Sequence, residues 1–235
     1  MIRLEVCVDD ALGLAEAVAG GADRVELCAA LSIGGLTPSH GLMAAAAAFE
    51  VPCYPMIRPR AGDFVFTVAE VEVMRADIRT ARALGLPGVV LGASRPDGTL
   101  DEAVLRVLLT ESAGLDVTLH RAIDLAPDKA AAVDTAIALG FRRILTSGGA
   151  LTAPDGVDVL ALMMERAGDC IIMPGSGVSV ASLPRLCHLP LREVHASCAV
   201  AVPSGGEPLR FGFQSGNEKR TDRVVVAALK AALAH

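Results

Sequence analysis

Two carboxylate and thiol pairs occur at the same spacing near the beginning of the sequence. Glu5 and Cys7 lie in the segment Arg-Leu-Glu-Val-Cys, and Glu26 and Cys28 lie in the matching segment Arg-Val-Glu-Leu-Cys. The glutamates could perform general acid–base chemistry, and cysteine thiolates are soft ligands that select Cu(I). Side chains alternate between the two faces of a strand, so each Glu and Cys shares one face, opposite the aliphatic residues. Cys7 and Cys28 are therefore candidate metal ligands.

Three further side chains that could do chemistry stand at the ends of later predicted strands. The same alternation turns Arg58, His120 and His195 toward the face that carries the glutamates and cysteines. A guanidinium binds anions, and an imidazole exchanges protons near neutral pH. We take Arg58, His120 and His195, together with Glu5 and Glu26, as candidate catalytic residues.

A structural interpretation of the same residues stays open. Glu5 and Glu26 could neutralise basic side chains inside the protein, since burying an unpaired charge costs several kcal/mol. The basic side chains available for such a network are Arg3, Arg24 and Arg58. Two histidines at strand ends favour the functional interpretation, because a network of ion pairs would not need them.

Glycine-rich segments follow two of the later strands and could hold an anion. The backbone N–H groups of such loops bind anions in many α/β barrels, and glycine lets the backbone approach the ligand closely. The candidate anion-binding residues are Ser147, Gly148, Gly175 and Gly177, with Arg60 from the polar loop after the third strand. Ordinary tight turns are the alternative.

The elements that must position these residues alternate regularly between strands and helices. Short apolar strands are expected at residues 3–7, 24–28, 52–58, 88–91, 117–120, 143–146, 170–173 and 193–196, and a helix follows each. Strict alternation implies a parallel sheet, and eight units favour a closed (β/α)8 TIM-type barrel, formed by one domain over residues 1–235. Inward-facing polar side chains then meet at the C-terminal mouth. Residues 198–220 are expected to form a long loop or lid before the last helix.

Composition excludes several classes of partner. The net charge is −6, from 21 basic and 27 acidic residues without a basic block, so we expect no nucleic-acid partner. No apolar stretch is long enough to span a membrane, and the N-terminus has no secretory signal, so we expect a cytoplasmic protein. Six cysteines without a CxxC pair indicate reduced thiols.

Several motifs, in chain order, resemble the CutC copper homeostasis protein family. After the repeated Glu-x-Cys strands come GGLTPS at 34–39, IRPRAGDF at 57–64, HRAID at 120–124, LTSG at 145–148, MPGSG at 173–177 and EVH at 193–195. The resemblance covers nearly the whole chain. It implies a cytoplasmic TIM-type barrel, often a homodimer, with copper bound at the cysteines that match Cys7 and Cys28. Ala61 departs from the family pattern, which usually has a second glycine there.

Two functions follow as alternatives. In the first, Cys7 and Cys28 bind Cu(I), with Cys198 as a third candidate ligand. In the second, the protein is an enzyme of the isomerase or lyase type that acts on a small anionic or phosphorylated metabolite. Arg58 and the glycine loops would then hold the anion, while the histidines and glutamates would transfer protons. A barrel fold is compatible with either function.

Overall fold

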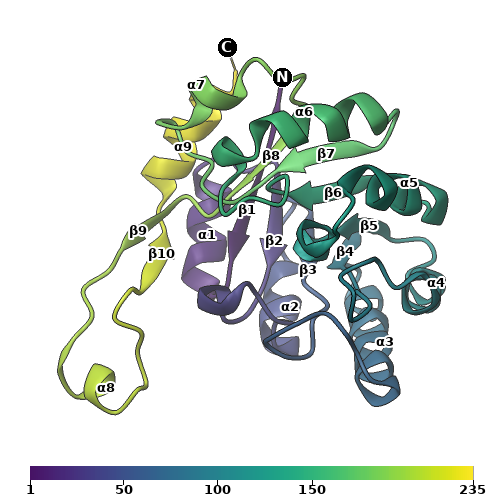
Figure 1. The fold of residues 1–235 in the computed structure, drawn as a ribbon. Coiled ribbons are helices and arrows are strands. Elements are labelled where there is room, and N and C mark those ends of the chain that lie inside the picture. The colour runs from purple at the N-terminus through teal and green to yellow at the C-terminus, as the bar shows by residue number, and fades with distance from the viewer. Residues whose placement is uncertain (235) are drawn as a thin grey trace.

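Eight parallel strands form the centre of the molecule, and helices cover their outer side (Figure 1). This computed structural model describes residues 1–234. The strands are β1 (Arg3–Val8), β2 (Arg24–Leu27), β3 (Cys53–Pro55), β4 (Gly88–Leu91), β5 (Asp116–Leu119), β6 (Arg143–Thr146), β7 (Ile171–Pro174) and β8 (Glu193–Ala196). They pair in two groups of four, in the orders β3-β2-β1-β8 and β4-β5-β6-β7. A parallel bridge between Met56 and Val90 joins the groups at one junction, and β7 lies against β8 at the other. The predicted (β/α)8 TIM-type barrel is confirmed.

The alternation along the first two strands is observed as predicted. Leu4, Val6, Val25 and Leu27 are fully buried in the hydrophobic core that the strands share with the surrounding helices. The opposite face points into the barrel. Chain positions on neighbouring strands are fixed by the pairing: Glu5 is opposite His195 in β1–β8, and Cys7 is opposite Glu26 in β1–β2.

The helices begin and end where local chemistry dictates. They are α1 (Ala11–Ala19), α2 (His40–Ala46), α3 (Val68–Ala83), α4 (Glu102–Glu111), α5 (Lys129–Leu139), α6 (Val157–Arg166), α7 (Leu183–Leu186) and α9 (Arg223–Ala232). In α3, Thr67 and Glu70 form a reciprocal capping box, which satisfies N–H groups that the first turn leaves free. Its buried side chains, Val71, Met74 and Ile78, recur at helical spacing and pack on the core. Within residues 1–234, no helix combines the length and the apolar character needed to span a bilayer.

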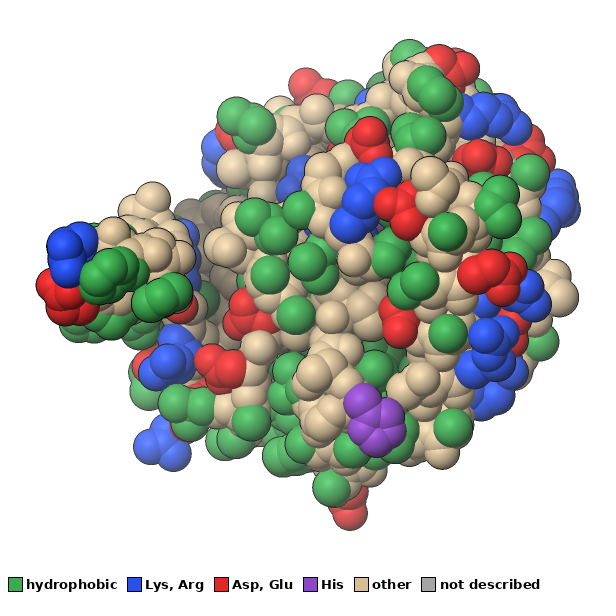
Figure 2. Space-filling model, turned by 90° about the horizontal axis from the view of Figure 1, so that it is seen from below, with side chains coloured by type: hydrophobic (Ala, Val, Ile, Leu, Met, Phe, Trp, Pro, Cys, Tyr) green, Lys and Arg blue, Asp and Glu red, His purple; other side chains and the backbone are tan. Residues whose placement is uncertain are grey.

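The segment between β8 and α9 is an arm rather than unstructured chain. Its strands β9 (Ala199–Ala201) and β10 (Lys219–Thr221) pair antiparallel, and a short helix, α8 (Gly206–Arg210), lies near the tip. The arm extends away from the barrel (Figure 1) and stands apart from the body of the molecule (Figure 2). Only the base of the hairpin, including Ala199 and Lys219, contributes to the mouth of the barrel.

Candidate functional site

A cavity of about 720 Å³ opens at the carboxyl ends of the strands. This volume lies in the range of small-molecule sites, which is roughly 300–1,000 Å³. Five of the residues expected to do chemistry line it together: Cys7, Glu26, Arg58, His120 and His195. They come from different strands or strand ends, so only barrel closure brings them to one place.

Cys7, Glu26 and His195 form a compact cluster on one side of the cavity. One ligand atom from each residue lies within 4.8 Å of the ligand atoms of the other two, and all three residues are buried. His195 Nε2 lies 3.7 Å from a carboxylate oxygen of Glu26. On the other side of the ring, His195 Nδ1 lies 2.8 Å from a carboxylate oxygen of Glu5. The pairing of Cys7 with Glu26 and of Glu5 with His195 across neighbouring strands explains why these four residues meet.

The two glutamates of this group have opposite pKa shifts. Burial alone would raise the pKa of Glu5, but the positive charges of Arg24 and His195 outweigh it and lower that pKa to about 2. Burial raises the pKa of Glu26 to about 7, because His195 only partly compensates for the lost hydration. The pKa of His195 is well above its usual value despite burial, since Cys7, Glu26 and Glu5 favour the imidazolium. A carboxyl group that titrates near pH 7 is suited to acid–base chemistry.

Cys28 lies beneath the cavity wall. It is fully buried and packs against Tyr54, Met56 and Val90. Its thiol donates to Glu26 at 3.6 Å, and burial raises the pKa of Cys28 well above the usual 9.0. The chain after β2 folds over it, so that a side-chain carbon at Gly35 would lie only 3.0 Å from the sulfur. The structure therefore brings Cys7 into the cavity and leaves Cys28 outside its lining.

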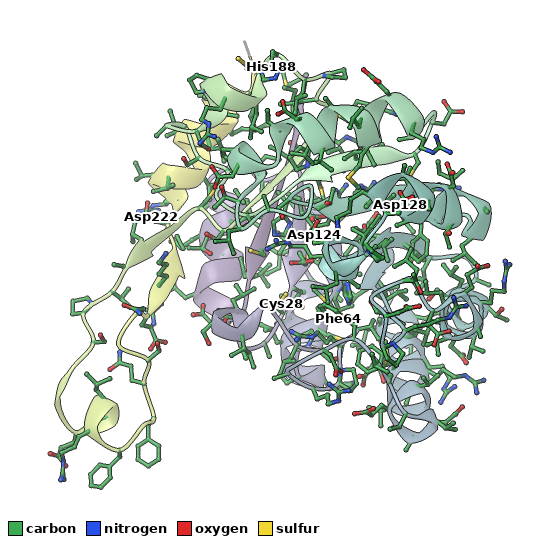
Figure 3. All side chains as sticks on the ribbon, in the orientation of Figure 1. Cys28, Phe64, Asp124, Asp128, His188 and Asp222 are labelled. Carbon is green, nitrogen blue, oxygen red and sulfur yellow. The ribbon has the colours of Figure 1, made fainter. Side chains whose placement is uncertain are left out.

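Arg58 and His120 also line the cavity, and both pack against the ring of Phe64, which is labelled in Figure 3. The Arg58 guanidinium donates to the backbone carbonyls of Ile33, Gly35 and Gly62 at 2.8–3.0 Å. His120 Nδ1 accepts a hydrogen bond from the N–H of Ala122 at 3.1 Å. Burial and the nearby charge of Arg58 lower the pKa of His120 to about 3, so its ring is neutral at pH 7. The Phe64 ring centroid is 4.7 Å from the His120 ring and 4.9 Å from the Arg58 guanidinium carbon.

The glycine loop after β6 holds an anion that belongs to the protein itself. The carboxylate of Asp124 accepts hydrogen bonds from the N–H groups of Ser147 and Gly149, at 3.0–3.2 Å, and from the hydroxyls of Thr146 and Ser147. Ser147 and Gly148, two of the predicted anion-binding residues, are absent from the cavity lining, whereas Asp124 is part of it (Figure 3). This loop therefore positions a protein side chain.

The other predicted anion-binding residues differ in whether they line the cavity. Gly177 lines the cavity, whereas Gly175 packs behind His195 and is not part of the lining. Arg60 lies outside the cavity, where its guanidinium pairs with Asp63 and Glu70. Only Gly177 of this set reaches the candidate site.

A buried network of charges fills the barrel below the cavity. Arg24 pairs with Glu5 and Glu193, and Arg143 pairs with Glu193 and Asp116. The sequence pattern predicted a network of this kind, but without Arg143, Asp116 or Glu193. Arg143 begins β6 and Asp116 begins β5, so the signal lay in charged residues at strand starts. Of the other predicted members, Arg3 is exposed, and Arg58 has only carbonyl partners among residues 1–234.

The chain as a whole is similar to known proteins. The model of the CutC family matches residues 2–200. CutC family proteins of Sinorhizobium medicae and Caulobacter vibrioides are 55% and 49% identical to this chain, over 99% and 98% of its length and 96% of theirs. The crystal structure of the CutC protein of Streptococcus agalactiae, which is named for copper homeostasis, superimposes with a TM-score of 0.80 at 30% identity, covering 84% of this chain and 99% of that one. A phosphoribosyl anthranilate isomerase of Thermococcus kodakaraensis, at 14% identity and a TM-score of 0.62, shares the fold.

Proposed function

The chain belongs to the CutC family, and on that premise we propose that it acts in copper homeostasis by binding Cu(I) at Cys7 and His195. The observation that carries this proposal is the cluster of Cys7, Glu26 and His195, whose ligand atoms lie within 4.8 Å of one another. A thiolate and an imidazole are ligands that suit copper. Glu26 offers a carboxylate oxygen as a third ligand.

The surroundings of His195 support a ligand role. Histidines that bind metals commonly donate their second ring N–H to a carboxylate, which fixes the tautomer and the ring orientation. Glu5 provides that carboxylate, 2.8 Å from His195 Nδ1, and thereby leaves Nε2 toward Cys7 and Glu26. Copper would displace protons from the thiol and from Nε2, so binding should weaken as the pH falls.

This proposal differs from the pair of cysteines that the family resemblance implies. Cys28 is fully buried, donates its thiol proton to Glu26 and has a strongly raised pKa, all of which oppose thiolate formation. We propose that Cys28 supports Glu26 and that Cys7 holds the ion.

Competition with a chromogenic Cu(I) chelator tests the assignment. We expect Cys7→Ser and His195→Gln each to remove tight stoichiometric binding, whereas the matched control Cys28→Ser retains it. Glu5→Gln should weaken binding about 10- to 100-fold by releasing the orientation of His195. Retention of tight binding by Cys7→Ser, or its loss in Cys28→Ser alone, would contradict the assignment.

A second candidate function is favoured by the size of the cavity. About 720 Å³ is far more space than a single ion occupies, and Glu26, whose pKa is about 7, faces it as an acid–base group. We propose acid–base catalysis on a small organic molecule as this second function. A screen for metabolites that raise the melting temperature tests it, with His120→Ala expected to abolish the rise. The cytoplasmic location and the homodimer that the resemblance implies stay predictions.

A further inference from the structure

Three buried polar atoms that lack a hydrogen-bond partner belong to residues lining one cavity. They are Glu26 Oε1, Arg58 Nε and His120 Nε2. In residues 1–234 only two other buried side-chain atoms lack a partner, on Ser94 and Asp116, and neither residue lines this cavity. Buried polar groups are nearly always hydrogen-bonded, and each unmet group is costly. Their concentration around one cavity indicates that a ligand completes them.

Two of these atoms, His120 Nε2 and Arg58 Nε, are hydrogen-bond donors. His120 Nδ1 accepts from the Ala122 N–H, so the proton of the neutral ring is on Nε2, which is a donor. The Nε–H of Arg58 is a second donor. Both side chains are more than nine-tenths buried, with 2% of His120 and 4% of Arg58 exposed. Two of the three unpartnered atoms, on Arg58 and His120, are therefore N–H donors, and the third, Glu26 Oε1, is an acceptor.

Arg58 also provides a positive charge without a counter-ion. Its three hydrogen bonds all end on backbone carbonyls, and no carboxylate of residues 1–234 pairs with it. A buried charge is usually paired because removal from water is costly. His120 supplies no negative charge, since its ring is neutral at pH 7. An anionic ligand would supply the missing charge.

We propose that the cavity binds a small hydroxy acid, whose carboxylate accepts hydrogen bonds from Arg58 Nε and His120 Nε2 and whose hydroxyl donates to Glu26 Oε1. Two single N–H donors and one positive charge match the two oxygens and the single charge of a carboxylate. Phosphate groups are commonly held by a nest of backbone N–H groups. In the loop after β6, Ser147 N–H and Gly149 N–H are already taken by Asp124.

Phe64 controls access to these donors. Its ring packs on both His120 and Arg58 and also lines the cavity, so it shields the unpartnered atoms from water. The side chain is only partly buried, and rotation about its side-chain bonds uncovers the donors when the acid enters. Phe64→Ala should therefore bind the acid with a faster association rate.

Calorimetric titration of chelator-treated, copper-free protein tests the proposal with three probes: glycerate, propionate and inorganic phosphate. We expect glycerate to bind more tightly than propionate, which lacks the hydroxyl, and phosphate to bind least. His120→Asn keeps an oxygen that accepts from the Ala122 N–H but removes the Nε2 donor, and it should bind glycerate about tenfold more weakly or worse. Glu26→Gln should reduce the difference in affinity between glycerate and propionate.

A matched control tests whether the effects belong to this cavity. Arg60→Lys changes a guanidinium outside the cavity, so it should bind glycerate as the wild type does. Arg58→Lys should lose glycerate binding; if it does not fold, His120→Asn alone decides. Absence of binding by both carboxylates, preference for phosphate, or unchanged affinity in His120→Asn would overturn the proposal. Because copper is absent throughout, none of these results depends on the copper assignment.

Discussion

Replacing Glu26 with glutamine should stabilise the metal-free protein at neutral and alkaline pH. The carboxyl group is buried, and its pKa rises from the usual 4.5 to about 7 in the folded protein. Folding therefore favours the protonated form, and the wild type loses stability as the pH rises from about 4.5 to about 7. At about 1.4 kcal/mol per pKa unit, the loss amounts to about 3 kcal/mol. Glutamine has no ionisable carboxyl group, so the Glu26→Gln variant does not lose this stability.

Glu5→Gln is the matched control, because it changes the same residue type in the neighbouring strand but should lower the free energy of unfolding instead of raising it. The pKa of Glu5 is lowered from 4.5 to about 2, so its ionised form stabilises the fold above about pH 4.5, and this contribution is lost only as the pH falls toward 2. Glu5→Gln should therefore cost about 3 kcal/mol at every pH between about 5 and 8.

Urea denaturation at a series of pH values measures both effects. The free energy of unfolding of Glu26→Gln, relative to the wild type, should rise by about 3 kcal/mol between about pH 4.5 and pH 8, with an unchanged dependence on urea concentration. A difference that stays constant with pH, or a variant less stable than the wild type at pH 8, would refute our account of Glu26. Stabilisation would show that the fold tolerates an unfavourable carboxyl group in the cavity, as functional sites do.

Three further predictions concern other parts of the molecule. Asp124→Ala should lower the free energy of unfolding by about 3 kcal/mol, because the N–H of Ser147 and the hydroxyl of Thr146, both buried residues, lose their acceptor. In a urea titration, the exposed Asp134→Ala should leave the midpoint nearly unchanged. Replacing residues 203–216 of the arm with a short Gly/Ser turn should preserve the urea midpoint, since α8 buries no residue, and a large drop would contradict this. Gly92→Ala would place a carbon 2.5 Å from the imidazole of His120 and displace it, so calorimetry should show loss of glycerate binding with Cu(I) binding retained.

Much of the barrel could be predicted from local sequence patterns. Strands at 88–91, 143–146 and 193–196 were predicted with the bounds that the structure shows. These runs are apolar and bounded by glycine, proline or charged residues, and their signal is local. The β9–β10 hairpin was not predicted, because it pairs two three-residue strands far apart in the sequence, whose register depends on a non-local contact.

The candidate site could be predicted only in part from the sequence. Alternation in the strands turned Cys7, Glu26 and His195 inward, and the structure brings them together. The same alternation treated Cys7 and Cys28 as equivalent. Cys28 is instead buried because the loop after β2 folds over it, and alternation within a strand carries no information about such a loop.

The sequence by itself determined which side chains face into the barrel, since strand alternation and the alternation of strands with helices are properties of neighbouring residues. Tertiary structure decided which of those side chains meet. The stagger between β1 and β2 places Cys7 opposite Glu26, and barrel closure places Glu5 opposite His195. It also decided which polar groups are left without partners, because satisfaction of a buried group depends on every neighbour around it. The repeated Glu-x-Cys strands thus contribute Glu26 and Cys7 to the cavity, whereas Glu5 contacts His195 and Cys28 contacts Glu26.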